Sequence, residues 1–219
     1  MGKEAPESRI YQLLSARQKT LSTAESLTGG MIGSIITSVP GVSSVYCGGV
    51  ITYSNEEKHQ LVSVSTKTLK KYGAVSKKCA KEMAEGCAKL FSSDCSIAVT
   101  GNAGPTGSED KPVGLVYIGL CVDGEVSAKK YRFEGDRESI RRQTAEEALS
   151  LLLAALKEKG GKKAKASGKK QDKKAGRKEK KEKKASVPEK AHAETSAPET
   201  SAPETSVPET PAADTPAET

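Results

Sequence analysis

Almost every large apolar side chain of this 219-residue chain lies before Leu156. A chain folds only where buried apolar surface offsets the entropy that is lost on ordering. The sequence therefore predicts one globular domain in residues 1–157, a length sufficient for a core of ordinary size. It also predicts a disordered Lys-rich linker over residues 158–184 and a disordered tail rich in Pro, Glu and Thr over residues 185–219.

The charge of the chain changes at the same boundary. Residues 157–184 carry 15 Lys or Arg against 4 acids, and residues 185–219 carry 1 Lys against 7 acids. Subtracting +11 and −6 from the formal net charge of +7 leaves +2 for residues 1–156. Net charge therefore gives no support to a nucleic-acid surface on the folded domain. The Lys-rich segment fits either a polyanion-binding or nuclear-localisation segment or a merely solvated linker.

A five-residue repeat marks the end of the chain. Ser-Ala-Pro-Glu-Thr begins at Ser196 and Ser201, and Ser-Val-Pro-Glu-Thr begins at Ser206. Proline at every fifth residue opposes helix and sheet, so we expect an extended spacer without chemistry of its own.

Cysteine and histidine usage indicates the compartment and argues against a metal site. The 5 cysteines of the chain include no C-x-x-C pair, and residues 1–18 lack the apolar run of a secretory signal. We therefore expect reduced thiols, a cytoplasmic location, and no membrane span, because the apolar run Leu149 to Leu156 is too short. His59 is the one histidine of the expected domain, so neither a metal nor another cofactor is predicted.

Hydrophobic periodicity predicts alternating strands and helices. Strands are expected over residues 19–24, 43–53, 95–100, 113–122 and 125–133, and helices over 7–18, 31–39, 54–61, 66–72, 76–91 and 138–157. The last two strands are joined by Asp123-Gly124, which favours a type I′ hairpin. This order predicts an α/β fold, a three-layer domain with a mixed β-sheet flanked by helices.

The stretch Thr23-Ala24-Glu25-Ser26-Leu27-Thr28-Gly29-Gly30 holds the first candidate for chemistry. Ser26 lies where a predicted strand turns into a predicted helix, beside backbone N–H groups that have no partner within the helix. A hydroxyl next to free N–H donors is the minimal arrangement for acyl transfer. The alternative is that Ser26 or Thr28 only caps the helix.

A base for Ser26 would have to be His59 or a lysine. Lys58 follows Ser54-Asn55-Glu56-Glu57, an S-x-x-E pattern that predicts a capped helix start. Burial and the positive end of that helix would both lower the pKa of Lys58, so that its amine could accept a proton. The alternative is an exposed solubilising charge.

A third candidate is the glycine-rich loop of residues 101–107, which follows the strand 95–100. Open α/β sheets bind ligands at the carboxyl ends of their strands. The loop lacks the Gly-Lys pair of a phosphate-binding loop, and a plain turn is the alternative.

Several blocks together resemble the C-terminal domain of the CinA competence-damage family, whose stand-alone members include nicotinamide-nucleotide amidases. Besides residues 23–30, the matching blocks are residues 49–58 (GVITYSNEEK), 73–76 (GAVS), 100–105 (TGNAGP), 111–114 (KPVG) and 135–137 (GDR), with Arg141-Arg142. They occur in one order from about Leu14 to Leu156.

The resemblance implies hydrolysis of the carboxamide of nicotinamide mononucleotide (NMN), giving nicotinate mononucleotide and ammonia. It implies Ser26 as nucleophile, Lys58 as base and Tyr53 as a supporting hydroxyl, with no cofactor. N–H groups at Thr28, Gly29 and Gly30 would hold the oxyanion, and a homodimer is expected. Candidate partners for ribose and phosphate are Ser44, Gly101, Asn102, Ala103, Gly104, Arg137 and Arg141, with Arg142 as an alternative arginine.

The chain also departs from the family pattern. Leu27 replaces a small residue and Asn102 an aliphatic one, which bears on substrate fit rather than on reaction type. The Lys-rich segment and the repeats have no counterpart. A second hypothesis is therefore a catalytically inactive scaffold whose basic tail binds nucleic acid or an acidic partner.

Overall fold

The computed structural model describes residues 4–178. The chain divides into a unit of residues 1–173 and a unit of residues 174–219, and only residues 174–178 of the second unit are described. The prediction of disorder for residues 179–184 and for the repeats lies outside the described residues.

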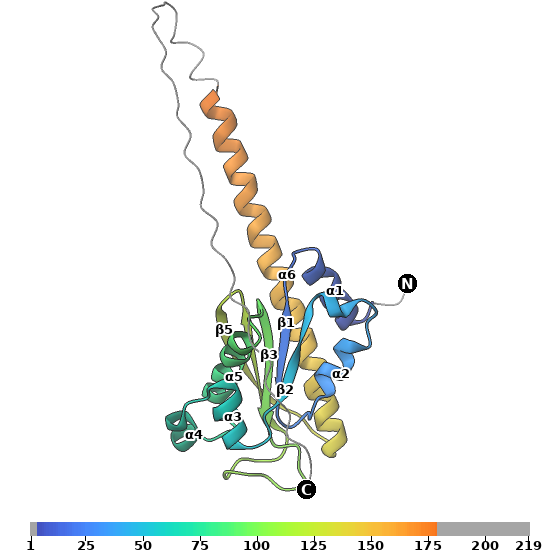
Figure 1. The fold of residues 1–219 in the computed structure, drawn as a ribbon, viewed down its shortest axis with the longest axis vertical. Coiled ribbons are helices and arrows are strands. Elements are labelled where there is room, and N and C mark those ends of the chain that lie inside the picture. Colours follow the sequence, from blue (N-terminus) through green and yellow to red (C-terminus); the bar gives the residue numbers. More distant parts are fainter. Residues whose placement is uncertain (1–3, 179–219) are drawn as a thin grey trace, which may run out of the picture. The chain divides into compact units, whose positions relative to one another are not determined.

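Five strands form one mixed sheet in the order β2-β1-β3-β4-β5 (Figure 1). The strands are β1 (Leu21–Glu25), β2 (Tyr46–Ile51), β3 (Cys95–Gly101), β4 (Leu115–Val122) and β5 (Glu125–Arg132). β2, β1 and β3 are parallel, whereas β4 and β5 are antiparallel to their neighbours. Asp123 and Gly124 both have positive φ, 54° and 79°, as a type I′ hairpin requires. The predicted mixed sheet and its hairpin are confirmed.

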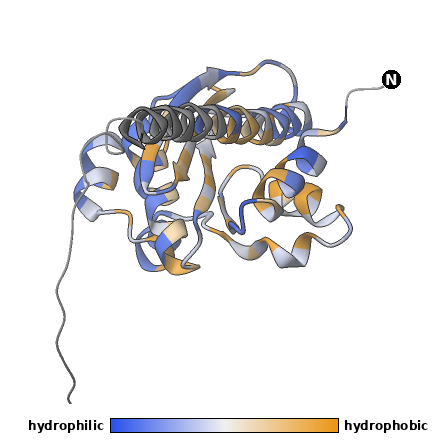
Figure 2. Cartoon of the chain, turned by 90° about the horizontal axis from the view of Figure 1, so that it is seen from above, coloured by the Kyte–Doolittle hydropathy of each residue, from blue (hydrophilic) through white to orange (hydrophobic). Residues whose placement is uncertain are grey.

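Helices cover both faces of the sheet, which gives the predicted three layers (Figure 1). One face carries α1 (Pro6–Ser15), α2 (Met31–Thr37) and α6 (Arg137–Lys178). The other carries α5 (Lys77–Leu90), against which α3 (Asn55–Val62) and α4 (Thr66–Tyr72) pack. Hydrophobic and hydrophilic residues alternate within individual helices in Figure 2, as expected for helices that bury one side.

The two faces are packed with side chains of different size. The α1, α2 and α6 face buries large aliphatic residues, among them Leu14, Ile32, Ile97, Ile118 and Leu152. The α5 face buries mainly small residues and one methionine, among them Ala24, Cys79, Met83, Ala84, Cys87 and Ala98. Cys79, Met83 and Cys87 follow one another at helical spacing along α5 and are fully buried, whereas Leu90 near the end of the helix is 49% exposed.

Two glycines let α5 approach its neighbours closely. A Cβ on Gly119 of β4 would lie 2.1 Å from the carbonyl oxygen of Ala80 in α5. A Cβ on Gly86 of α5 would lie 1.8 Å from the carbonyl oxygen of Val62 at the end of α3. Neither position has room for a methyl group, so α5 and the elements around it are held at backbone contact distance.

Several element boundaries differ from the sequence prediction. Residues Val42–Ser44 form a short 3₁₀ helix, and β2 begins only at Tyr46. The helix predicted to end at Lys157 continues to Lys178 in α6. Lysine and alanine are strong helix formers, so this part of the predicted linker favours the helix that precedes it.

Candidate active site

Three parallel strands end at one edge of the sheet and define the site. β1 ends at Glu25, β2 at Ile51 and β3 at Gly101. The chain leaves β1 toward α2 and leaves β2 toward α3, and these helices lie on opposite faces of the sheet. Such divergence leaves a crevice at the carboxyl ends of the strands. A cavity of about 360 Å³ lies here; its lining includes Ser26, Leu27, Tyr53, Asn55, Lys58, Val75, Gly101, Asn102, Ala103, Gly104, Glu109 and Arg137.

Ser26 and Lys58 meet in this cavity. The Lys58 Nζ lies 3.2 Å from the Ser26 Oγ, within hydrogen-bond distance. Lys58 is only 2% exposed and Ser26 only 8%. The alternative that Lys58 is an exposed solubilising charge is therefore wrong, because its side chain is buried. Burial of a lysine amine is rare and costly.

Backbone carbonyls orient the Lys58 amine. Nζ donates to the carbonyl oxygen of Thr52 at 2.7 Å and has longer contacts with those of Ser54 at 3.4 Å and Tyr53 at 3.5 Å. A neutral amine has two N–H bonds and one lone pair. In the neutral form, N–H groups on the carbonyls would leave the lone pair directed at the Ser26 hydroxyl.

The start of α3 fixes the position of Lys58 along the chain. The Ser54 side chain accepts a hydrogen bond from the Glu57 backbone N–H at 3.0 Å, so the predicted N-cap is confirmed. Lys58 then lies one helical turn from the cap, with its side chain directed into the interior.

Burial is the main cause of a lowered pKa at Lys58. Desolvation disfavours the charged ammonium, and the nearby groups Cys79 and Glu109 oppose this effect only partly. The pKa therefore lies below the ordinary value of 10.5. This direction is the one that a lysine base requires.

The start of α2 is capped by Glu25 rather than by Ser26 or Thr28. The Glu25 carboxylate is 2% exposed and accepts hydrogen bonds from the N–H groups of Gly30 at 3.0 Å, Ile32 at 3.1 Å and Gly33 at 2.8 Å. Thr28 Oγ1 is buried and has no hydrogen-bond partner among the described residues. The alternative role of Ser26 or Thr28 as a cap is therefore wrong.

This cap changes which N–H groups are free to bind an oxyanion. The Gly30 N–H is bound to Glu25, and the Gly29 N–H donates to the Ser26 carbonyl at 3.1 Å. Of the predicted donors at Thr28, Gly29 and Gly30, only Thr28 keeps an N–H without an acceptor in the described part of the chain, and the Leu27 N–H joins it. The N–H groups without an acceptor therefore lie directly after Ser26 and not in the glycine pair.

Arg141 of α6 holds the backbone of the Ser26 turn. Its Nε donates to the Leu27 carbonyl at 3.1 Å and its Nη2 to the Thr28 carbonyl at 2.8 Å. In a trans peptide the N–H points opposite to the C=O, so the bond to Leu27 fixes the direction of the Thr28 N–H. Arg141 does not line the cavity, so its position does not support the prediction that it contacts the substrate.

Arg137 is the arginine at the cavity. Its Nη1 donates to the Gly104 carbonyl at 2.7 Å and its Nη2 to the Tyr53 hydroxyl at 2.9 Å. Tyr53 is 60% exposed, and its hydroxyl has no hydrogen bond to Ser26 or Lys58. The supporting role of the Tyr53 hydroxyl remains a prediction, and Arg137 is the contact that the structure gives it.

Ser44 and Arg142 lie away from the cavity. The Ser44 hydroxyl is exposed and donates to the Gly41 carbonyl at 2.9 Å, while Arg142 forms an exposed ion pair with Glu138 at 2.9 Å. Neither contributes a side chain to the cavity, so the sequence prediction of Ser44 as a ribose or phosphate partner gains no support.

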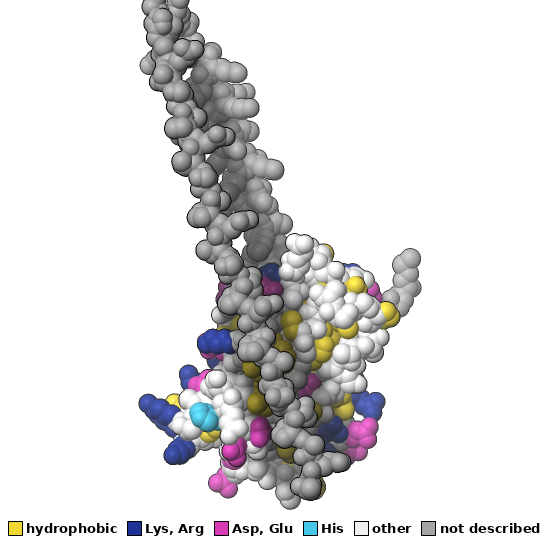
Figure 3. All heavy atoms as spheres, in the orientation of Figure 1, with side chains coloured by type: hydrophobic (Ala, Val, Ile, Leu, Met, Phe, Trp, Pro, Cys, Tyr) yellow, Lys and Arg dark blue, Asp and Glu magenta, His cyan; other side chains and the backbone are white. Residues whose placement is uncertain are grey.

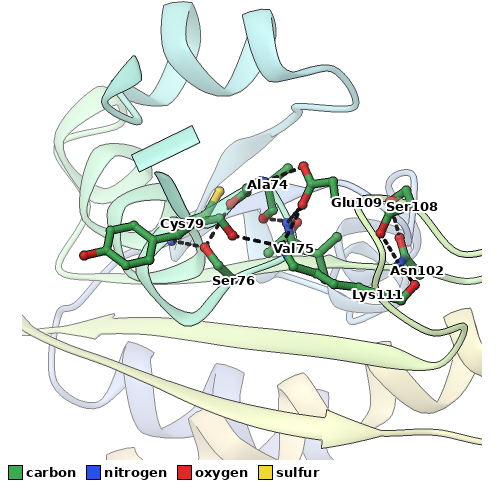
Figure 4. Close-up of polar contacts among 11 residues, drawn as sticks. Ala74, Val75, Ser76, Cys79, Asn102, Ser108, Glu109 and Lys111 are labelled. Atoms are coloured by element: carbon green, nitrogen blue, oxygen red, sulfur yellow. Dashed lines mark hydrogen bonds and ion pairs between the residues drawn. The ribbon is translucent and has the colours of Figure 1, made fainter. Parts of the chain in front are cut away.

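The loop after β3 is tied down by side chains (Figure 4). The Asn102 amide donates to the Lys111 carbonyl at 2.9 Å and accepts from the Ser108 hydroxyl at 2.6 Å. The Glu109 carboxylate accepts from the N–H groups of Ala74 at 2.8 Å and Val75 at 3.2 Å. Asn102 thus helps to shape the cavity wall. Asparagine in place of an aliphatic residue would therefore affect which substrates fit the cavity.

Glu109 was missed by the sequence analysis. It also pairs with Lys111 at 2.8 Å. Burial alone would raise the pKa of Glu109, but the hydrogen bonds from Lys111, Ala74 and Val75 outweigh it, so the pKa lies below its ordinary value. No local pattern marks this carboxylate, because the backbone N–H groups that it binds, those of Ala74 and Val75, lie 35 and 34 residues before it in the sequence.

Leu27, the other residue that departs from the family pattern, is 4% exposed and belongs to the larger apolar core while also lining the cavity.

No cluster of three His, Cys, Asp or Glu capable of holding a metal ion occurs among the residues that the structure describes. Within the same residues, no helix is both long and apolar enough to cross a membrane.

The fold and the site define an α/β protein with a serine hydroxyl against a buried lysine amine at the carboxyl edge of a mixed sheet. Residues 3–156 match the family model of the CinA C-terminal domain. The chain belongs to this family.

Similar proteins have the same family names. A putative competence-damage inducible protein of Clostridium perfringens is 46% identical over 156 residues, covering 71% of this chain and 38% of that protein. A CinA-like protein of Thermotoga neapolitana is 47% identical over 161 residues, covering 73% and 39%. The chain thus spans less than half the length of these relatives, whose names specify no reaction.

Solved structures of CinA superfamily proteins resemble the whole domain. One from Klebsiella pneumoniae is 34% identical with a TM-score of 0.68, covering 70% of this chain and 96% of that chain. A competence/damage inducible protein from Agrobacterium tumefaciens is 38% identical with a TM-score of 0.65, covering 68% and 92%. The predicted family membership is confirmed.

Proposed function

We propose that this protein is an amidohydrolase that converts NMN to nicotinate mononucleotide and ammonia, with Ser26 as nucleophile and Lys58 as general base. The observation that carries the proposal is the 3.2 Å contact between Lys58 Nζ and Ser26 Oγ, because it joins a nucleophile to a buried amine of lowered pKa. A nucleophile within hydrogen-bond reach of its base is the arrangement that acyl transfer needs.

In the first half of the reaction, the Ser26 hydroxyl gives its proton to the lone pair of Lys58 while Oγ attacks the carboxamide carbon. The carbonyl oxygen becomes an oxyanion, which the N–H groups of Leu27 and Thr28 stabilise. Arg141 fixes the peptide unit that carries the Thr28 N–H, and the bond from the Gly29 N–H to the Ser26 carbonyl fixes the unit that carries the Leu27 N–H, so they need no reorganisation when the charge develops.

Collapse of this intermediate breaks the C–N bond. The Lys58 ammonium hands its proton to the leaving nitrogen, which departs as ammonia and leaves an ester on Ser26. Water then gives a proton to Lys58 and attacks the ester in the same way, releasing the carboxylate product and the Ser26 hydroxyl. The Thr52 carbonyl holds the amine throughout.

The rim of the cavity suits the phosphate of a mononucleotide. The Arg137 guanidinium is held there by the Gly104 carbonyl and the Tyr53 hydroxyl, and a planar guanidinium binds phosphate oxygens in pairs. Gly101, Ala103 and Gly104 offer a wall with little side chain, along which ribose fits.

The test is ammonia release from NMN by the purified full-length chain, with the product identified by mass spectrometry. We expect Ser26→Ala and Lys58→Ala each to lower kcat by about 10²–10⁴-fold or more while the circular dichroism spectrum stays unchanged. Ser44→Ala, an exposed serine outside the cavity, is the matched control and should keep full activity. Absence of ammonia release by the wild type, or equal activity in all three variants, would refute the proposal.

A further inference from the structure

A second concave site lies on the α5 side of the domain, apart from Ser26 and Lys58. It has a volume of about 480 Å³, and its polar and aromatic walls come from Tyr72, Lys77, Lys78, Lys81, Lys111 and Tyr117. We call it the lysine–tyrosine groove. Its walls come from the end of α4, the first turns of α5, the loop before β4 and β4 itself.

The groove lies in the most basic part of the described domain. Residues 66–81 contain six lysines and no acid, whereas residues 1–156 together carry a balance of only +2. In Figure 3, Lys and Arg side chains gather at the edge of the molecule where Figure 1 shows α4. Lys78 pairs with Glu82 and Lys111 with Glu109, while Lys77 and Lys81 have no ion pair among residues 4–159, whose side chains the structure describes.

Strand register places a further cation beside Tyr117. Tyr117 of β4 is the direct partner of Lys130 of β5, and directly paired residues project from the same face of a sheet. That face is the α5 side, since Gly119, two residues along, abuts Ala80 of α5. Lys129, the next residue, is paired with Ile118 and therefore lies on the opposite face.

Two aromatic rings complete the groove. Tyr72 is 47% exposed, and Lys71 Nζ lies 5.3 Å from the centre of its ring. Tyr117 is half-buried and also lines the groove. Lysines that neutralise phosphates, interleaved with rings on which bases stack, are the means by which proteins bind single-stranded nucleic acid without reading its sequence.

We propose that the lysine–tyrosine groove binds a single-stranded nucleic acid, with its phosphates at Lys77, Lys81 and Lys130 and its bases against Tyr72 and Tyr117. The site shares no residue with the Ser26–Lys58 pair, so it stands whether or not the chain hydrolyses NMN. Net charge misses this surface because it averages the cluster over the whole domain.

The test is fluorescence anisotropy of a labelled oligothymidylate of about 10 nucleotides with the full-length chain at several salt concentrations. The variant Lys77→Gln/Lys130→Gln removes a lysine of α5 that lines the groove and the lysine of β5 that is paired with Tyr117. The matched control Lys89→Gln/Lys129→Gln removes one lysine from each of the same elements elsewhere. Both variants keep the C-terminal lysines, so tail binding is the same in each.

We expect the groove variant to bind about tenfold more weakly at low salt and to lower the salt slope by about 1.4, with the control unchanged. Tyr72→Leu/Tyr117→Leu should weaken binding by about fivefold or more without changing the salt slope. Equal effects of the two lysine variants, no binding by the wild type, or equal affinity for a duplex of the same length with no effect of the tyrosine variant would each overturn the proposal.

Discussion

The two faces of the sheet are built on different principles. The face under α1, α2 and α6 is filled by bulky aliphatic side chains such as Ile97, Ile118 and Leu152. The face under α5 is filled mainly by alanine and cysteine, and Gly86 and Gly119 bring backbone against backbone. The first face derives its stability from apolar area, and the second from close approach.

The comparison explains where the buried lysine can be placed. Lys58 lies on the α5 side, in α3, whose last residue touches Gly86. A thin layer of small residues holds α3 near the sheet, so the amine reaches Ser26 at the end of β1. The bulky face supplies the stability that offsets the cost of burying that amine.

The largest effect is expected on the bulky face. Leu152→Ala should lower the free energy of unfolding by about 2–5 kcal/mol, because Leu152 is fully buried and its truncation leaves a cavity. Chemical denaturation measures the loss. The kcat of the folded fraction should stay at the wild-type value, and a large fall in kcat would show that the two faces are not separable in this way.

A smaller loss of stability but a larger loss of activity is expected on the close-packed face. Gly86→Ala places a methyl group against the Val62 carbonyl, which should cost about 1–3 kcal/mol. Because α3 must shift, Lys58 should move away from Ser26 and kcat should fall more than in Leu152→Ala. Denaturation and ammonia release on the same samples give the comparison; wild-type kcat in Gly86→Ala would contradict it.

The smallest effect concerns the pH dependence of stability. The pKa of Lys58 is lowered in the folded state, so between that pKa and 10.5 the unfolded chain binds a proton that the folded chain does not. Stability from this group therefore rises with pH across that window, by at most about 1.4 kcal/mol per pH unit. Lys58→Met should lose this dependence and be more stable than wild type below the window. Parallel pH profiles of the two proteins would show that Lys58 is not the cause.

The sequence determined those features that depend on local patterns. The hairpin follows from Asp123-Gly124, the start of α3 from the Ser54 cap, and the mixed sheet from the order of strands and helices. Ser26 and Lys58 were both marked by their places at the starts of helices, and the family blocks around them implied a pair. Such signals lie within a few residues of the chain, where the sequence is informative.

The tertiary structure alone decided which groups surround that pair. Glu25 accepts hydrogen bonds from the N–H groups at the start of α2, so those of Leu27 and Thr28 remain without an acceptor in the described residues. Arg137 rather than Arg141 lines the cavity, and Glu109 forms part of its wall. The lysines of α4, α5 and β5 likewise became one surface only in the fold. The contacts of Arg137 and Glu109 join residues far apart in sequence and depend on how the layers pack. Glu25 lies close in sequence to the N–H groups that it binds, but its carboxylate reaches them only because the chain turns sharply after β1.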